Sequence, residues 1–139
     1  MLHRFEGDTG RRLRVESLVT QKIVRGNREL AEQLADIVRL RPLVAGEKLI
    51  EQNGTDNDVF MVLAGAVQIV VNGRAVGRRG PNDHVGEMAA IEPTQKRAAS
   101  VIALEESVVA AISEPQFAEL GNTYPELYRC LAKELARRL

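Results

Sequence analysis

Apolar residues recur at two different spacings along the chain, first that of a helix and then that of strands. After Asn27, which favours the start of a helix, apolar residues follow every three or four positions, at Leu30, Leu34, Ile37 and Val38. We predict a helix from Asn27 to about Leu40. Pro42 should stop it, because proline disfavours helical backbone in the residue before it.

Between Leu43 and Ile112 the apolar runs are short and are separated by turns rich in Gly, Asn and Asp. Strand candidates lie around Lys48–Glu51 and Val59–Leu63, and two more lie within Ser100–Ile112, bent at Glu105–Ser107. The clearest hairpin spans Ala66–Arg79, because alternating apolar residues lead up to Asn72-Gly73, a dipeptide that favours a type I′ turn. This spacing predicts a small β-barrel or jelly roll rather than a parallel sheet.

The C-terminal part of the chain is predicted to be helical. Ser113 and Gln116 have the spacing of a capping box, and Gly121-Asn122 should break the helix that it starts. Pro125 suits the first turn of another helix. Its apolar stripe comprises Leu127, Leu131, Leu135 and Leu139.

Residues 1–26 are polar and basic, with apolar positions that suit one side of a short helix. We interpret them as an N-terminal arm that folds onto the body or onto a partner chain, and residues 27–139 as one domain. The chain stops inside its last predicted helix, so we expect a further C-terminal domain in the natural protein.

Composition narrows the classes of function. Nineteen Lys and Arg residues balance nineteen Asp and Glu residues among 139, so no overall field favours nucleic acid or an anionic membrane. No apolar run reaches membrane-spanning length and no signal peptide is visible, which favours a cytoplasmic protein. The single cysteine, Cys130, excludes an internal disulfide, and no His, Cys or carboxylate cluster has metal-ligand spacing.

The stretch Val85–Val101, VGEMAAIEPTQKRAASV, combines three chemical features. Its small residues let backbone N–H groups approach a ligand, and a short helix from Glu87 would direct free N–H groups at an anion. Arg97 can grip a phosphate with two prongs, and Glu87 can accept a hydrogen bond from a hydroxyl. Together these groups suit a sugar phosphate.

This stretch resembles the phosphate-binding cassette of the cyclic nucleotide-binding domain family, in the pattern G-E-x-A, a variable turn and R-A-A-S. The resemblance covers roughly residues 28–139 and implies an α+β fold, a jelly-roll β-barrel with flanking N- and C-terminal helices. The ligand-binding residues that it implies are Gly86, Glu87, Met88, Ala89, Arg97, Ala98, Ala99 and Ser100.

In that family, the residue matching Arg97 holds the cyclic phosphate and the residue matching Glu87 accepts the ribose 2′-hydroxyl. Backbone N–H groups at Ala89 and Ala98 complete the phosphate shell, and neither metal nor cofactor is needed. By the same resemblance the C-terminal helices swing when ligand binds, with the Leu stripe of the last helix, Tyr124 and Tyr128 as a lid over the base. Static packing of this tail on the barrel, or dimerisation through it, stays an open alternative.

A narrower resemblance rests on the phrases FEGDTGRR, GNRELAEQLAD, LIEQNGTDNDVF, VNGRAV, HVGEMAAIEP and AKELARRL. They are similar to bacterial proteins that join this domain to a TIR domain, some of them effectors of the Pycsar anti-phage system. This implies cyclic UMP, or else cyclic CMP, as the ligand, with a NAD-degrading TIR domain as the partner. A homodimer is also expected, since two-fold assembly is the commonest symmetric state.

Two other interpretations stay open, and a third is not expected. The chain could be the cAMP-responsive sensor of a signalling protein or a transcription regulator, although no helix-turn-helix is visible up to Leu139. It could be an interaction module without a ligand, against which Glu87 and Arg97 argue. Catalysis is not expected, because His3, His84 and Cys130 show no catalytic or metal-binding arrangement.

Overall fold

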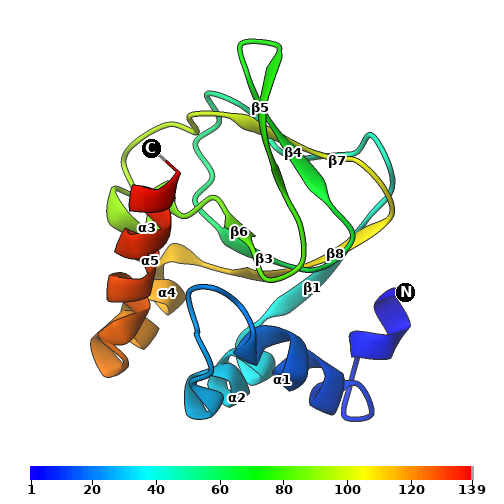
Figure 1. Ribbon diagram of the computed structural model, residues 1–139, viewed down its shortest axis with the longest axis vertical. Coiled ribbons are helices and arrows are strands. Elements are labelled where there is room, and N and C mark those ends of the chain that lie inside the picture. The colour runs from blue at the N-terminus through cyan, green and yellow to red at the C-terminus, as the bar shows by residue number, and fades with distance from the viewer. Residues whose placement is uncertain (139) are drawn as a thin grey trace.

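The chain folds into a roll of two antiparallel sheets with helices at both ends, and the computed structural model describes residues 1–138 (Figure 1). The N-terminal helices are η1 (Leu2–Phe5), α1 (Arg11–Val19) and α2 (Arg28–Ile37). The strands are β1 (Arg39–Leu43), β2 (Lys48–Ile50), β3 (Val59–Ala64), β4 (Val67–Val71), β5 (Arg74–Arg79), β6 (His84–Val85), β7 (Ser100–Ala103) and β8 (Ser107–Ile112). The other helices are α3 (Met88–Ile91), α4 (Glu114–Thr123) and α5 (Glu126–Arg137).

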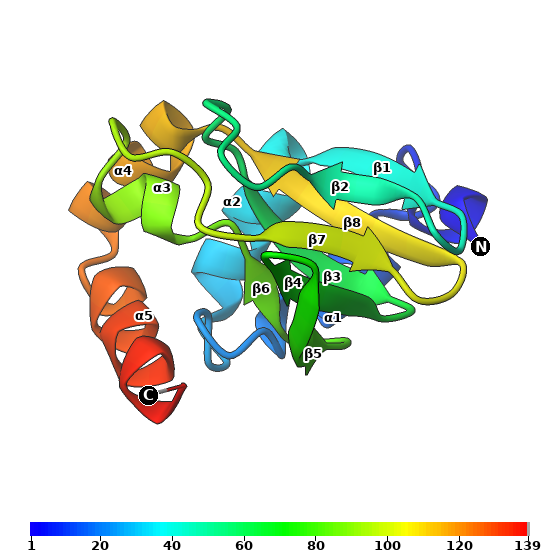
Figure 2. The same ribbon diagram turned by 90° about the horizontal axis from the view of Figure 1, so that it is seen from above.

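The eight strands of the described residues form two four-stranded sheets, in the orders β1-β8-β3-β6 and β2-β7-β4-β5. The first sheet lies toward the N-terminal helices (Figure 1), and α4 and α5 lie at one end of the roll (Figure 2). This arrangement confirms the predicted α+β jelly roll between N- and C-terminal helices. No helix in the described part of the chain has the length and apolar character needed to cross a membrane.

Strand β3 is buried on both faces, which explains its uninterrupted apolar sequence. Val59, Met61 and Leu63 belong to the core shared with the helices. Phe60 and Val62, between them in sequence, belong to the core inside the roll. Successive side chains of a strand point to opposite faces, so the first sheet separates the two cores.

The N-terminal segment packs against the roll in the same chain. Phe5 and Leu18 are buried in the core that the helices share with the first sheet. The buried Gln21 side chain donates to the Val62 carbonyl at 2.8 Å, and Lys22 forms an ion pair with Asp83 at 2.6 Å. Residues 1–26 thus contribute to the main core of the domain.

Several local predictions are confirmed. The Asn27 side chain accepts from the Leu30 N–H, and Ser113 forms a complete capping box with Gln116. The hairpin between β4 and β5 turns at Asn72 and Gly73, whose φ angles are 51° and 79°, as a type I′ turn requires. Leu139 of the predicted apolar stripe lies outside the described residues.

Two predicted boundaries are wrong. Helix α2 ends at Ile37, and Pro42 lies in strand β1 opposite Val108. This strand tolerates proline because it lies at the sheet edge and pairs only with β8. Gly121 and Asn122 also lie inside helix α4 rather than ending it. Glycine at 121 serves a close contact, because a Cβ there would stand 2.1 Å from the Tyr128 ring.

Candidate functional site

The segment between β6 and β7 forms one wall of a pocket in the roll. It starts at Gly86, whose φ of +80° suits glycine. A Cβ there would lie 2.8 Å from the Asp58 carbonyl oxygen and 2.9 Å from Arg97 Nη1. Glycine at this position therefore lets the chain turn into α3 and lets the Arg97 guanidinium approach the backbone.

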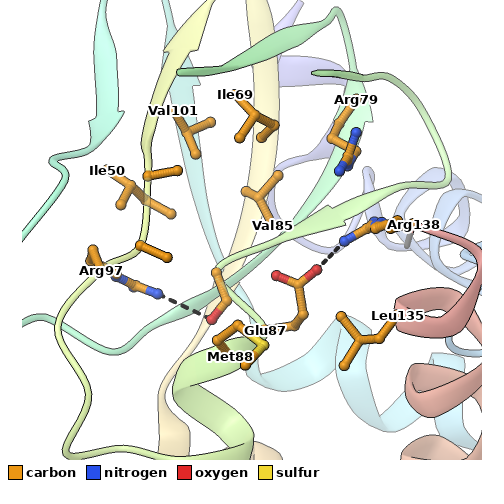
Figure 3. A pocket seen from close by; sticks show the side chains of 13 residues that line it. Ile50, Ile69, Arg79, Val85, Glu87, Met88, Arg97, Val101, Leu135 and Arg138 are labelled. Atoms are coloured by element: carbon orange, nitrogen blue, oxygen red, sulfur yellow. Dashed lines mark hydrogen bonds and ion pairs between the residues drawn. The ribbon is translucent and has the colours of Figure 1, made fainter. Parts of the chain in front are cut away.

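The pocket has a volume of about 180 Å³ and is lined from both sheets, the 86–99 segment and the last helix (Figure 3). Six of the predicted site residues line it: Gly86, Glu87, Met88, Arg97, Ala98 and Ala99. The other lining residues are Ile50, Ile69, Arg79, Val85, Val101, Leu135 and Arg138. Most of the wall is thus apolar, with four ionisable side chains placed around it.

Two predicted site residues do not line the pocket. The Ala89 side chain is buried, and its N–H donates to the Gly86 carbonyl at 3.3 Å. The Ser100 hydroxyl accepts from the Gln52 N–H at 2.9 Å and so fixes the chain that follows β2. Both residues support the segment that carries the pocket wall.

Arg97 is held from several directions. Its side chain is only 5% exposed, and Nη2 donates to the Asp58 carbonyl at 2.7 Å and to the Asp56 carboxylate at 2.9 Å. Its Nη1 donates to the Gly86 carbonyl at 3.1 Å. The guanidinium is therefore fixed in one orientation at the pocket wall before any ligand arrives.

Glu87 faces the same pocket from the N-cap position of α3. Its carboxylate accepts from Arg138, and His84 Nδ1 lies 3.2 Å from Oε1 in a direction unsuited to a hydrogen bond. Burial alone would raise the pKa of Glu87, but His84 and then the Arg138 charge outweigh it and hold this pKa below its ordinary value of 4.5. Glu87 is therefore an ionised acceptor near neutral pH.

Two pocket arginines are missing from the sequence prediction. Arg79 lies at the end of β5, and its Nε is buried with no hydrogen-bond partner within residues 1–138. Arg138 follows α5 and donates to Glu87 and to the His84 carbonyl, the latter at 3.2 Å. In the sequence, only the adjacent Arg137-Arg138 pair at the end of the last predicted helix hints at the role of Arg138.

A site of this kind can bind an anion beside a hydroxyl group. Arg97 supplies a fixed cation and Glu87 a fixed acceptor, and apolar residues surround both. A match to known proteins specifies this chemistry further, since residues 40–124, more than half of the chain, match the family described as cyclic nucleotide-binding domain. The chain belongs to the cyclic nucleotide-binding domain family.

Relatives in two bacteria match this cyclic nucleotide-binding domain over all 139 residues. It is 52% identical to the Pycsar effector protein BcPycTIR of Burkholderia cepacia and 45% identical to the Pycsar effector protein XpPycTIR of Xanthomonas perforans. The matches cover 46% of each relative, so the chain spans about half the length of the curated relatives it matches.

A solved structure has the same fold. The regulatory domain of Toxoplasma gondii PKA, crystallised with cAMP, superposes with a TM-score of 0.78 over 91% of this chain and 50% of that chain, at 24% identity. This likeness supports the architecture of the cyclic nucleotide-binding domain independently of the sequence motifs.

The two tyrosines predicted to form a lid do not line the pocket of this cyclic nucleotide-binding domain. The Tyr124 hydroxyl donates to Glu29 at 2.7 Å and accepts from Gln33 at 2.9 Å, which ties the C-terminal end of α4 to α2. The Tyr128 ring packs edge-on against Phe117, with centroids 5.7 Å apart. Leu135, about two turns beyond Tyr128 and part of the Leu stripe of the predicted lid, does line the pocket, as does Arg138.

No group of three or more His, Cys, Asp or Glu side chains is placed to hold a metal ion in the described part of the chain. The buried His84 and Cys130 do not belong to such a group. His84 contributes to the site through Glu87 and through the carbonyl that Arg138 contacts.

Proposed function

We propose that this pocket binds a 3′,5′-cyclic nucleotide, with its phosphate on Arg97 and its ribose 2′-hydroxyl on Glu87. The observation that carries the proposal is that a fixed guanidinium and an ionised carboxylate face one small cavity. A cyclic phosphodiester has one negative charge, which Arg97 and nearby backbone N–H groups can balance without a metal or cofactor.

A ligand phosphate could replace Asp56 as a hydrogen-bond partner of Arg97. The Asp56 side chain is 53% exposed, so water can solvate its carboxylate when a phosphate replaces it as the acceptor for an N–H group of the guanidinium. The carbonyls of Gly86 and Asp58 would keep Arg97 in place meanwhile. Arg97 can therefore change partners without moving.

Ligand binding would also affect the C-terminal helix. Arg138 donates to the carboxylate that the ribose hydroxyl needs, so ligand and Arg138 compete for Glu87. Release of Arg138 would loosen the end of α5 from the pocket. The helix that leads toward a following domain thereby reports whether the site is occupied.

We propose cyclic UMP as the first ligand and cyclic CMP as the second. Identities of 52% and 45% to proteins named Pycsar effectors support an anti-phage role. In that role a TIR domain following this sensor would degrade NAD when the cyclic nucleotide binds. The alternative is a cAMP sensor of a signalling protein or a transcription regulator, which the fold shared with a cAMP-bound PKA domain supports.

The proposal also includes an oligomeric state and a location for the protein. A homodimer in the cytoplasm would suit a sensor that activates a neighbouring effector domain, and light scattering with and without ligand tests the dimer. An unchanged monomer mass in the full-length protein under both conditions would contradict it.

A thermal-shift panel with 3′,5′-cyclic UMP, CMP, AMP and GMP, followed by calorimetry, tests the ligand. Specific binding to the native state raises the melting temperature by mass action. A shift with the pyrimidine nucleotides alone is the expected result. A shift with cyclic AMP alone favours the signalling alternative, and no binding of any of the four by calorimetry contradicts the proposed function.

A further inference from the structure

The second arginine of the pocket wall, Arg79, occupies a position where the strand pattern calls for an apolar residue. In the ladder between β4 and β5, Arg79 lies opposite the fully buried Val67, so both side chains share the inner face of the roll. The next inner position of β5 is Gly77, opposite Ile69. Strand β5 thus presents an arginine and a glycine to the interior.

Gly77 makes room for the Arg79 guanidinium. A Cβ at Gly77 would lie 2.9 Å from Arg79 Nη1, so any larger residue would push the guanidinium away. The ladder also shifts register between Ile69 and Val70, where Val76 is left without a partner. Such a bulge re-aims the strand next to a site. These features together direct Arg79 at the cavity.

Arg79 is partly buried, and its guanidinium has few partners. Its Nη1 donates to the Arg78 carbonyl at 3.0 Å, while its buried Nε has no acceptor within residues 1–138. Burial, and then the charge of Arg138, lower the pKa of Arg79, and only the charges of Glu87 and Asp83 oppose this. A buried donor without a partner is costly, so an acceptor brought by a ligand would be strongly favoured.

The position of Arg79 determines which part of the ligand could supply that acceptor. Arg97 and Arg79 lie on opposite sides of the pocket, with Glu87 between them (Figure 3). With the phosphate on Arg97 and the 2′-hydroxyl on Glu87, carbon C1′ faces away from the fused phosphate ring. The base would then extend between Ile69 and Leu135 toward Arg79.

We propose that Arg79 donates hydrogen bonds to a carbonyl oxygen of the base and thereby selects cyclic nucleotides of uracil or cytosine over those of adenine. Both pyrimidines carry a carbonyl at position 2, uracil carries a second at position 4, and adenine has none. Adenine offers only ring nitrogens as acceptors, at other positions than the pyrimidine carbonyls, so donors placed for a carbonyl would pair poorly with it, and poorly paired donors discriminate strongly between ligands. This inference rests on the proposed function.

The test is calorimetry of Arg79→Met and Arg79→Lys with cyclic UMP, CMP and AMP. Since a hydrogen bond from a charged donor is replaced, cyclic UMP should bind Arg79→Met roughly tenfold to a hundredfold more weakly than wild type. Arg79→Lys, which keeps a charged donor, should recover part of the loss. The control is Arg78→Met on the same strand, whose side chain is 70% exposed on the outer face and whose removal should leave affinity unchanged.

The pattern of losses decides the proposal. Loss for cyclic UMP and CMP together places the contact at the position 2 carbonyl, and loss for cyclic UMP alone places it at position 4 and narrows the selection to uracil. Either result supports the proposal. Unchanged affinity for cyclic UMP, or an equal loss for cyclic AMP, overturns it.

A second measurement varies the ligand and does not depend on how a variant folds. Thiocarbonyl sulfur accepts hydrogen bonds weakly, so either the 2-thio or the 4-thio analogue of cyclic UMP should bind wild type less tightly. That penalty should disappear in Arg79→Met. Two analogues that bind wild type as well as cyclic UMP does would overturn the proposal.

The two proposals fail in different ways. If wild type binds none of the cyclic nucleotides, the proposed function fails. If wild type binds cyclic UMP and Arg97→Ala weakens that binding while Arg79→Met leaves it unchanged, only the reading of the base by Arg79 fails.

Discussion

Each end of the pocket contains an arginine, but the two arginines are held very differently. Arg97 is gripped by a carboxylate and two backbone carbonyls. Arg79 donates to one carbonyl of its own strand and keeps a buried Nε without a partner in the described residues. One end is therefore fully assembled, whereas the other still needs an acceptor.

This difference suggests a division of labour between the two ends. A preorganised cation binds an anion with little reorganisation, which suits the phosphate that every cyclic nucleotide shares. A donor that lacks an acceptor penalises any ligand that does not supply one, which suits the base that distinguishes one nucleotide from another. Affinity would come mainly from the Arg97 end and specificity from the Arg79 end.

Removal of Arg97 should have the largest effect. A hydrogen bond between charged groups contributes about 1.5–3 kcal/mol, so Arg97→Ala should weaken the binding of every cyclic nucleotide about tenfold or much more. Arg74→Ala, at the exposed start of β5, is the control and should leave affinity unchanged. Calorimetry that gives equal losses for the two variants would refute the role of Arg97.

Removal of the charge of Glu87 should come next. Glu87→Gln should weaken the binding of cyclic UMP roughly tenfold, because an amide oxygen accepts from the ribose hydroxyl less strongly than a carboxylate does. The 2′-deoxy ligand, which lacks this hydroxyl, should bind the variant and wild type alike. A similar loss for both ligands would show that Glu87 acts on something other than the hydroxyl.

Gly86→Ala should damage the Arg97 end through the backbone. The left-handed conformation alone costs about 1–2 kcal/mol for a residue with a Cβ. The clashes with the Asp58 carbonyl and with Arg97 add to that cost and should also reduce affinity. Gly46→Ala is a matched control, because Gly46 has a φ of +86° and no neighbour within 4 Å of a built Cβ.

Chemical denaturation and calorimetry separate these two costs. Both alanine variants should lose stability, but only Gly86→Ala should bind cyclic UMP more weakly. Equal affinities in the two variants would mean that the close approach of Arg97 to Gly86 is unimportant for the ligand.

The smallest effect expected is one of pH on stability. The pKa of Glu87 is lower in the folded protein than its ordinary value of 4.5, so its stabilising contribution is fully present above about pH 4.5. It is lost as the pH falls through the lowered folded pKa. The difference in melting temperature between wild type and Glu87→Gln should therefore be constant from pH 7 to 5 and shrink below about pH 4.5. A difference that grows on acidification would contradict the assigned direction.

The assembled end of the pocket could be predicted from the sequence, and the other end could not. Glu87 and Arg97 lie ten residues apart in one connection, so a local motif reveals both. Arg138 and Glu87 are 51 residues apart and meet only because the fold brings the end of α5 to the pocket. Arg79 looks like an exposed hairpin residue until its pairing with Val67 is known.

The errors in the fold prediction have the same origin. Strand β1 reads RLRPL, in which charged residues and a proline hide a strand that only its edge position permits. Gly121 resembles a helix end, yet its lack of a side chain accommodates the Tyr128 ring. In both places a tertiary contact decides what the local residue pattern leaves ambiguous.

The crystal structure of the domain with cyclic UMP would test the central claim most directly. We expect the phosphate oxygens on Arg97, the 2′-hydroxyl on Glu87 and a base carbonyl within hydrogen-bond distance of Arg79. A nucleotide bound in the opposite direction, with its phosphate between Arg79 and Arg138 and its base beside Arg97, would contradict the division of labour between the two ends.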